Sequence, residues 1–277
     1  MSTLVDSIAP ADPVDARTVG PLLRGWRERR RFSQQELSNR SAVSTRHLSR
    51  VETGRAHPTP EMILHLADHL DVPLRARNEL LLAGGYAPHY RDRDLADASL
   101  AVVMDGLRGL LDAHMPYPAL LLDTYWDVVD ANEGVAALLE GCAPRLLEPP
   151  INVIRLCVHE EGLAPRIRNF TQWASHLHHQ LVHRAERTHD PRHFALAEET
   201  ARHLAAVPRT APTGSPVLTL ELTVPDAAPL RFFSTSAQLT TPADAALEGL
   251  HLETFLPADD ATRRRFEKNS QAVGPTW

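Results

Sequence analysis

The chain has 277 residues and a formal net charge of −6 at pH 7, and apolar residues make up 43% of it. At roughly 100–200 residues per domain, this length predicts about two domains, each large enough to bury a core. No stretch approaches the roughly 18 consecutive apolar residues of a membrane span, and no secretory signal opens the chain, so we expect a cytoplasmic protein. The two cysteines, Cys142 and Cys157, fit neither a disulfide framework nor a metal-binding pair.

The charge is unevenly distributed along the chain. Residues 1–93 hold 14 Arg and 11 Asp or Glu, a net +3, whereas residues 94–277 hold 15 Lys or Arg and 24 Asp or Glu, a net −9. A basic module joined to an acidic one indicates nucleic acid as the partner of the first half. Charge alone leaves open the alternative of a solvated, arginine-rich helix.

Five short helices are predicted in the first 85 residues. Apolar residues at helical spacing mark helices that begin near residues 19, 33, 44, 60 and 73. Ser33 and Glu36 have the spacing of a capping box, and Pro60 fits the first position of the fourth helix. The short turn between the second and third helices predicts an all-α, five-helix helix-turn-helix domain over residues 17–90.

Two motifs flank this turn. They are Phe32–Leu37 (FSQQEL) and Val51–Arg55 (VETGR), the latter followed by Pro58. Both resemble the Cro/C1-type, or xenobiotic-response-element (XRE), family of bacterial and phage regulators. In that family the third helix enters the major groove of double-stranded operator DNA and presents side chains to base edges.

The resemblance implies a set of DNA contacts. Gln34 would hold a phosphate at the start of the second helix, and Arg55 would make a second backbone contact. The implied reading face of the third helix consists of Ser44, Thr45, Arg46, Ser49 and Arg50. Arg46 can place two donors on guanine, whereas Ser44 fits the role of a helix N-cap equally well. Ala42 stands where the family usually has Gly, which predicts a strained turn.

Residues 91–94, with the sequence RDRD, predict a charged hinge, and a second domain is expected over residues 95–258. Residues 1–16 and 259–277 are predicted to be a flexible N-terminus and a C-terminal tail. The predicted elements of the second domain are a helix from Leu100 to Leu111, a hairpin of residues 119–122 and 126–131, a short helix capped by Asn132, a helical middle at 152–206, a Pro/Gly loop at 208–216 and three alternating strands near residues 218, 230 and 250. This order predicts an α+β, PAS-like domain with an antiparallel five-stranded sheet and helices packed on one side.

Two segments of this domain carry a second resemblance. Residues 121–132, which contain Leu121, Leu122 and Asp123 and then WDVVDAN, and Gly162–Phe170 (GLAPRIRNF) resemble the ligand-binding domain of methylenomycin-cluster-type (MmyB-like) regulators of actinobacteria. Members of that family bind apolar small molecules such as fatty acids, so the resemblance implies an apolar effector. The family usually has Trp where Phe170 stands, and a longer, Trp-containing stretch in place of residues 205–216.

A ligand cavity would need large apolar side chains and a partner for a ligand carboxylate. The candidates are Trp126, Arg168, Phe170, Trp173, Phe232 and Phe233. Each aromatic side chain could equally be an ordinary core residue that binds no ligand, and Arg168 could equally be a surface residue exposed to solvent.

Metal and catalytic signals are weak. His176, His179 and His183 share a helical face that is expected to point to solvent, and His159 lacks the second His of an HExxH motif, so we expect no metal and no cofactor. No nucleophile elbow, phosphate loop or dinucleotide fingerprint is present, and we expect no enzyme.

The sequence therefore predicts a homodimeric transcription regulator that senses an apolar molecule. The alternatives are a C-terminal domain that only dimerises or recruits a protein partner, and a helix-turn-helix fused to an enzyme domain assembled from distant positions.

Overall fold

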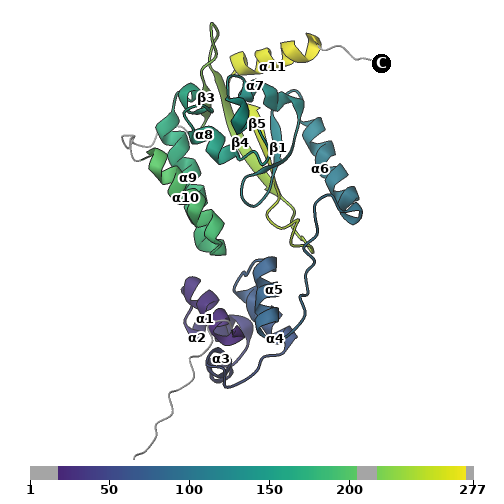
Figure 1. Ribbon diagram of the computed structural model, residues 1–277, viewed down its shortest axis with the longest axis vertical. Helices are drawn as coiled ribbons and strands as arrows, with labels where there is room; N and C mark the ends of the chain where they lie inside the picture. The colour runs from purple at the N-terminus through teal and green to yellow at the C-terminus, as the bar shows by residue number, and fades with distance from the viewer. Residues whose placement is uncertain (1–17, 205–216, 273–277) are drawn as a thin grey trace, which may run out of the picture. The chain divides into compact units, whose positions relative to one another are not determined.

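The computed structural model describes residues 18–204 and 217–272 (Figure 1). The chain divides into two compact units, Met1–Arg91 and Asp92–Trp277. The predicted flexible N-terminus at residues 1–16 and the predicted Pro/Gly loop at 208–216 lie outside the described residues.

Helices in the predicted places form the N-terminal unit. They are α1 (Val19–Arg29), α2 (Gln34–Ser41), α3 (Thr45–Glu52), α4 (Pro60–His69) and α5 (Leu74–Ala83). Ser33 opens α2 with a full capping box: its hydroxyl accepts from the backbone N–H of Glu36 at 3.1 Å, and its own N–H donates to the Glu36 carboxylate at 2.6 Å. The apolar faces of the five helices enclose one core, in which Leu48 and Val51 of α3 are almost fully buried. The all-α prediction for this unit is confirmed.

A five-stranded antiparallel sheet with helices on both faces forms the C-terminal unit. The strands are β1 (Ala119–Leu122), β2 (Val128–Ala131), β3 (Leu220–Leu222), β4 (Leu230–Gln238) and β5 (His251–Pro257). The helices are α6 (Ala101–Ala113), α7 (Ala136–Leu139), α8 (Val153–Val158), α9 (Phe170–Thr188), α10 (Pro191–Leu204) and α11 (Asp260–Ala272). The strands are arranged in the order β2-β1-β5-β4-β3, which confirms the predicted α+β class.

The expectation that helices cover one side of the sheet is wrong. One face, here called the inner face, packs its Leu122, Leu222 and Phe232 against α8, α9 and α10. The other face packs Leu121 and Leu252 against α6, on the far side of the sheet in Figure 1. Because side chains alternate along a strand, the all-apolar run of β1 supplies both cores at once.

The predicted tail is also wrong. Of residues 259–277, residues 260–272 form α11, and Phe266 is buried against Phe232 with ring centroids 5.5 Å apart. Phe266 thus attaches this charge-rich helix to the core of the C-terminal unit.

Asn132 has a different role from the predicted helix cap. Its side-chain oxygen accepts from the N–H of Ala119, and its amide donates to the carbonyls of Leu111 and Tyr117. The residue thus joins the end of α6 to the start of β1. None of the helices in the described ranges is long and apolar enough to cross a membrane.

Candidate functional site

The third helix of the N-terminal unit presents an exposed polar face. Its N-cap is Ser44, whose hydroxyl accepts from the N–H of His47 at 3.3 Å. From that start, Arg46 and Arg50 are exposed, while Thr45 and Ser49 are half-buried. The sequence left two roles open for Ser44, and the structure gives it the capping role, which leaves its hydroxyl able to donate its own proton.

Three arginines of this surface are free for an external partner. Arg46 and Arg50 on α3 and Arg55 in the following loop are all exposed. Within residues 18–204 and 217–272, none of the three guanidinium groups forms an ion pair or a side-chain hydrogen bond. Arginines without an internal partner are suited to phosphate oxygens and guanine edges.

A buried ion pair fixes the position of this helix. The Arg27 guanidinium on α1 donates to both carboxylate oxygens of Glu52 at the end of α3, at 2.7 and 2.9 Å. The same arginine donates to the carbonyl of Phe32 at 2.7 Å, ahead of α2. The side chains of Arg27 and Glu52 are only 9% and 4% exposed. The two residues are 25 positions apart in the chain, so the sequence holds no local signal of this pair.

Gln34 belongs to the same network. Its amide donates to Glu52 Oε2 at 2.8 Å, so the residue predicted to hold a phosphate also makes a structural contact. A carboxamide carries two N–H protons, so this bond leaves one of them for another acceptor. The network Arg27–Glu52–Gln34 therefore joins α1, α2 and α3.

The turn before α3 has a left-handed residue where the sequence predicts a strained turn. Ala42 has φ 56 and ψ 17, the left-handed conformation that glycine adopts most easily. A close approach fixes the other side of α3: a Cβ on Gly20 would lie 2.4 Å from the carbonyl oxygen of Val51. Only glycine fits there without movement of α1 away from α3.

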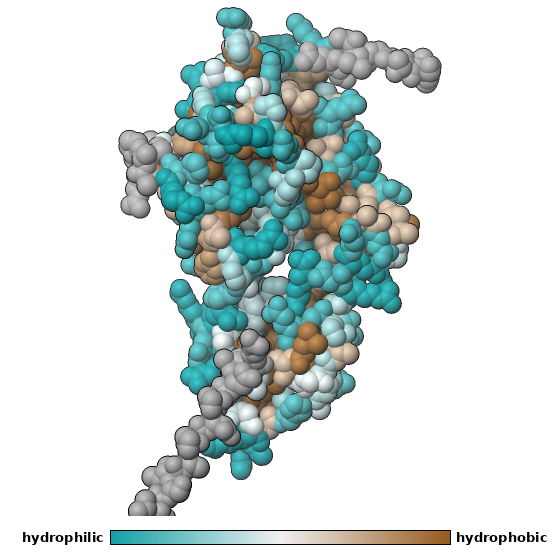
Figure 2. Space-filling model, in the orientation of Figure 1, coloured by the Kyte–Doolittle hydropathy of each residue, from teal (hydrophilic) through white to brown (hydrophobic). Residues whose placement is uncertain are grey.

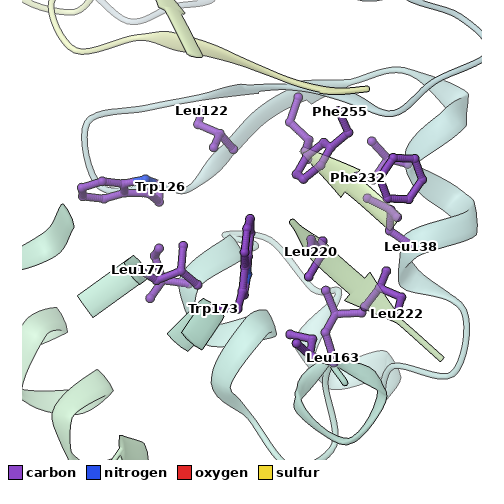
Figure 3. Close-up of a cluster of buried hydrophobic side chains, with 14 of the residues drawn as sticks. Leu122, Trp126, Leu138, Leu163, Trp173, Leu177, Leu220, Leu222, Phe232 and Phe255 are labelled. Atoms are coloured by element: carbon purple, nitrogen blue, oxygen red, sulfur yellow. The ribbon is translucent and has the colours of Figure 1, made fainter. Parts of the chain in front are cut away.

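The aromatic candidates of the C-terminal unit are divided between the faces of the sheet. Trp126, Trp173 and Phe232 are all buried in the inner core, to which the β1–β2 turn, α9 and β4 contribute them (Figure 3). Phe170, at the start of α9, packs against the same core while keeping part of its surface exposed. Phe233 is the neighbour of Phe232 in β4, so the two side chains lie on opposite faces of the sheet.

Arg168, the predicted partner of a ligand carboxylate, lies at the surface. Its side chain is exposed, and only its backbone N–H is engaged, donating to the carbonyl of Glu221 at 2.8 Å.

A basic group that the sequence did not single out, Arg184 of α9, lies against the core instead. Its guanidinium carbon is 5.0 Å from the Trp126 ring centroid, and it donates to the Thr124 hydroxyl at 3.3 Å. Burial lowers the pKa of Arg184 to about 10.

Two buried histidines adjoin Arg184. His193 Nε2 lies 2.9 Å from the carbonyl of Thr124, which can only accept, so this nitrogen carries the proton. His193 Nδ1 lies 2.7 Å from the hydroxyl of Thr188. His251 bonds the carbonyl of Gly249 through Nδ1 at 3.0 Å, and burial lowers the pKa of both imidazoles. His193 is thus bonded to the β1–β2 turn, and His251 is bonded to the loop just before β5.

The histidines of α9 differ in exposure. His179 and His183 are exposed on α9, as the helical spacing predicts, while burial lowers the pKa of His176. In the part of the chain that the structure describes, no three His, Cys, Asp or Glu side chains are grouped closely enough to hold a metal ion.

The five-helix unit with its free arginines and the α+β unit with its buried core define a two-domain protein of the helix-turn-helix class. Residues 19–80 match the family model of a helix-turn-helix domain. Residues 103–268, more than half of the chain, match the MmyB-like transcription regulator ligand binding domain. The chain therefore belongs to the MmyB-like transcription regulators. A search of the curated proteins finds no match.

Proposed function

We propose that the protein is a homodimeric, sequence-specific DNA-binding regulator whose C-terminal domain binds an apolar effector such as a fatty acid. The observation that carries the DNA-binding part is a trio of exposed arginines without partners in the described residues: Arg46 and Arg50 on α3, and Arg55 in the loop after it. The buried Arg27–Glu52 pair holds α3 in position. The family matches support the regulatory role.

The three arginines would make two kinds of contact, one with bases and one with phosphates. Arg46, one residue inside the N-terminus of α3, is placed to donate both N–H groups to O6 and N7 of a guanine. Arg50 lies one turn later on the same face. Arg55 follows the helix and suits a phosphate oxygen, which fixes register without reading sequence.

The homodimer is supported by the apolar surface of α6 and by the usual two-fold use of helix-turn-helix domains. Val102 and Leu110 are 85% and 54% exposed on the face of α6 that turns away from the sheet. Apolar side chains gather over this part of the C-terminal unit (Figure 2). An exposed apolar face of this kind is available for a contact between subunits.

DNA fragments selected from a random pool by the full-length protein would test the DNA-binding part. Against the selected sequence, Arg46→Ala should cost about 1–3 kcal/mol, with little loss on random DNA, whereas Arg55→Ala should weaken both alike. Arg24→Ala is the matched control, because Arg24 is exposed but paired with Glu28 at 2.7 Å. An equal loss on both DNAs for Arg46→Ala would show that Arg46 does not read a base.

Footprinting on the selected fragment tests the dimer. Two inverted half-sites should be protected, with centres about 34 Å apart or a multiple of that distance. Protection of a single half-site would contradict the symmetric dimer. A C-terminal domain that only dimerises or recruits a protein would still give the paired footprint, but no apolar molecule would alter it.

A further inference from the structure

An ion pair holds the first residues of the C-terminal unit to the loop between β4 and β5. The Arg93 guanidinium lies 3.6 Å from the Asp244 carboxylate, and the Arg93 backbone N–H donates to the same carboxylate at 3.3 Å. The two side chains are 22% and 7% exposed. Within residues 18–204 and 217–272, Asp244 Oδ2 makes no hydrogen bond, so the charge of Arg93 offsets the burial of this oxygen.

Each unit holds the chain close to the boundary between them. In the N-terminal unit, the Asn78 side chain on α5 donates to the carbonyl of Tyr90 at 2.8 Å and accepts from its N–H at 3.0 Å. Arg93 belongs to the C-terminal unit, so only Arg91 and Asp92 lie between these two attachment points. Three Cα–Cα steps span at most about 11 Å, so a movement of Arg93 is not absorbed by a long linker.

The loop that carries the acid of this pair packs on the β1–β2 turn. Gly249 lies so close to Thr124 that an added Cβ would be 2.8 Å from the Thr124 Cβ. The carbonyl of Gly249 bonds His251 Nδ1 at 3.0 Å, and the ring centroids of His251 and Trp126 are 5.9 Å apart. Trp126 belongs to the inner core. The segment from Asp244 to His251 therefore connects the ion pair to the packing around Trp126.

A second attachment of the chain follows the ion pair. Leu95 packs against the core between the sheet and α6, in which Leu247 and Leu250 of the same loop are buried. This apolar contact does not depend on the charge of Arg93. If the ion pair opened while Leu95 stayed in place, the segment between Tyr90 and the next attachment point would lengthen from two residues to four, residues 91–94.

We infer that the Arg93–Asp244 pair is a latch through which effector binding to the C-terminal unit changes DNA binding. With the latch closed, two residues link the units and restrict where α3 can be placed. With the latch open, four residues link them and that restriction is relaxed. An effector that binds one of these states more tightly shifts the balance between them. This inference rests on the proposed function and adds the route by which its effector acts, with Arg93 and Asp244 as positioning residues.

The affinity of the full-length protein for its selected DNA, measured with and without saturating dodecanoate, tests the latch. Arg93→Ala removes the guanidinium, whereas Asp244→Asn removes the charge and keeps an oxygen for the N–H of Ala246, which donates to Asp244 at 3.0 Å. In the wild type, dodecanoate should change DNA affinity by about fivefold or more. In both variants this factor should fall to within about twofold, although each variant still binds dodecanoate and DNA. Loss of coupling without loss of binding is not expected from a merely structural role.

Two further variants serve as controls. Arg91→Ala removes the same charge from an exposed residue of the same segment, and Arg93→Lys keeps a cation at the latch, so both should retain the wild-type factor.

The outcomes separate the latch from the proposed function. A wild-type factor in Arg93→Ala overturns the latch and leaves the proposed function intact. A wild type that binds dodecanoate without any change in DNA affinity also overturns the latch. A wild type that binds no dodecanoate overturns the proposed fatty-acid effector and the latch together. If Asp244→Asn fails to fold in a thermal melt, Arg93→Ala decides the question.

Discussion

The two units differ in how they treat an acidic side chain inside the fold. In the N-terminal unit the buried carboxylate of Glu52 is held by Arg27 and Gln34. In the C-terminal unit Glu253 of β5 shares the inner face of the sheet with Phe255, it forms no ion pair within residues 18–204 and 217–272, and burial raises the pKa of its carboxyl. A buried acid that is held by a cation stabilises the fold only while both partners are present, whereas a desolvated acid without a cation destabilises it.

The largest effect on stability is expected from removal of Glu52, the buried acid of the N-terminal unit. Glu52→Ala leaves the Arg27 guanidinium buried without its carboxylate, and should lower the free energy of unfolding of that unit by about 3 kcal/mol. Chemical denaturation followed by circular dichroism measures the loss. Glu28→Ala is the control, because Glu28 is exposed and its removal should leave stability unchanged. A small effect of Glu52→Ala would show that the pair does not hold the helices together.

Removal of the buried acid of the C-terminal unit should have the opposite sign. Glu253→Gln should raise the free energy of unfolding by about 1 kcal/mol at neutral pH, because a desolvated charge without a cation is replaced by a neutral amide of the same size.

The pH dependence of this gain follows from the raised pKa of Glu253. Folding favours the protonated form of this carboxyl, so its contribution to stability is complete below the unfolded pKa and is lost as pH rises through the folded pKa. The advantage of Glu253→Gln over the wild type should therefore grow with rising pH and disappear in acid. Thermal melts over a pH series measure it, and a gain that is constant with pH would contradict the account.

The smallest effect concerns the turn before the reading helix. Ala42→Gly should stabilise the N-terminal unit by about 1 kcal/mol, because it relieves a non-glycine residue at φ 56. Gly54→Ala is the reverse control and should destabilise the unit. Gly54 has φ +71, and no atom lies within 4 Å of an added Cβ, so this substitution adds backbone strain without a steric clash. Equal melting temperatures for the two variants would contradict the strain at Ala42.

The features that depend on a few neighbouring residues could be predicted from the sequence. The capping box at Ser33 and the left-handed turn at Ala42 follow from a few neighbouring residues, and both are confirmed. The Arg27–Glu52 pair joins residues 25 positions apart, and no local pattern indicates it.

In the C-terminal unit, side chains alternate between the two faces of the sheet along each strand. This alternation puts Phe232 and Phe233 on opposite faces and Glu253 and Phe255 on the same face, so the facing of these residues could be predicted from the sequence. The exposure of Arg168 and the proximity of Arg184 to Trp126 depend on how α9 packs on the sheet, which the helical period alone does not give.

The central claim is that an effector in the C-terminal unit changes DNA binding by the N-terminal unit. Its direct test is the affinity of the full-length protein for its selected DNA with and without a saturating fatty acid such as dodecanoate. The account predicts a change equivalent to a coupling of about 1–3 kcal/mol, and the same factor in dodecanoate affinity when the DNA is present. DNA affinity that is unchanged while dodecanoate is bound would contradict it.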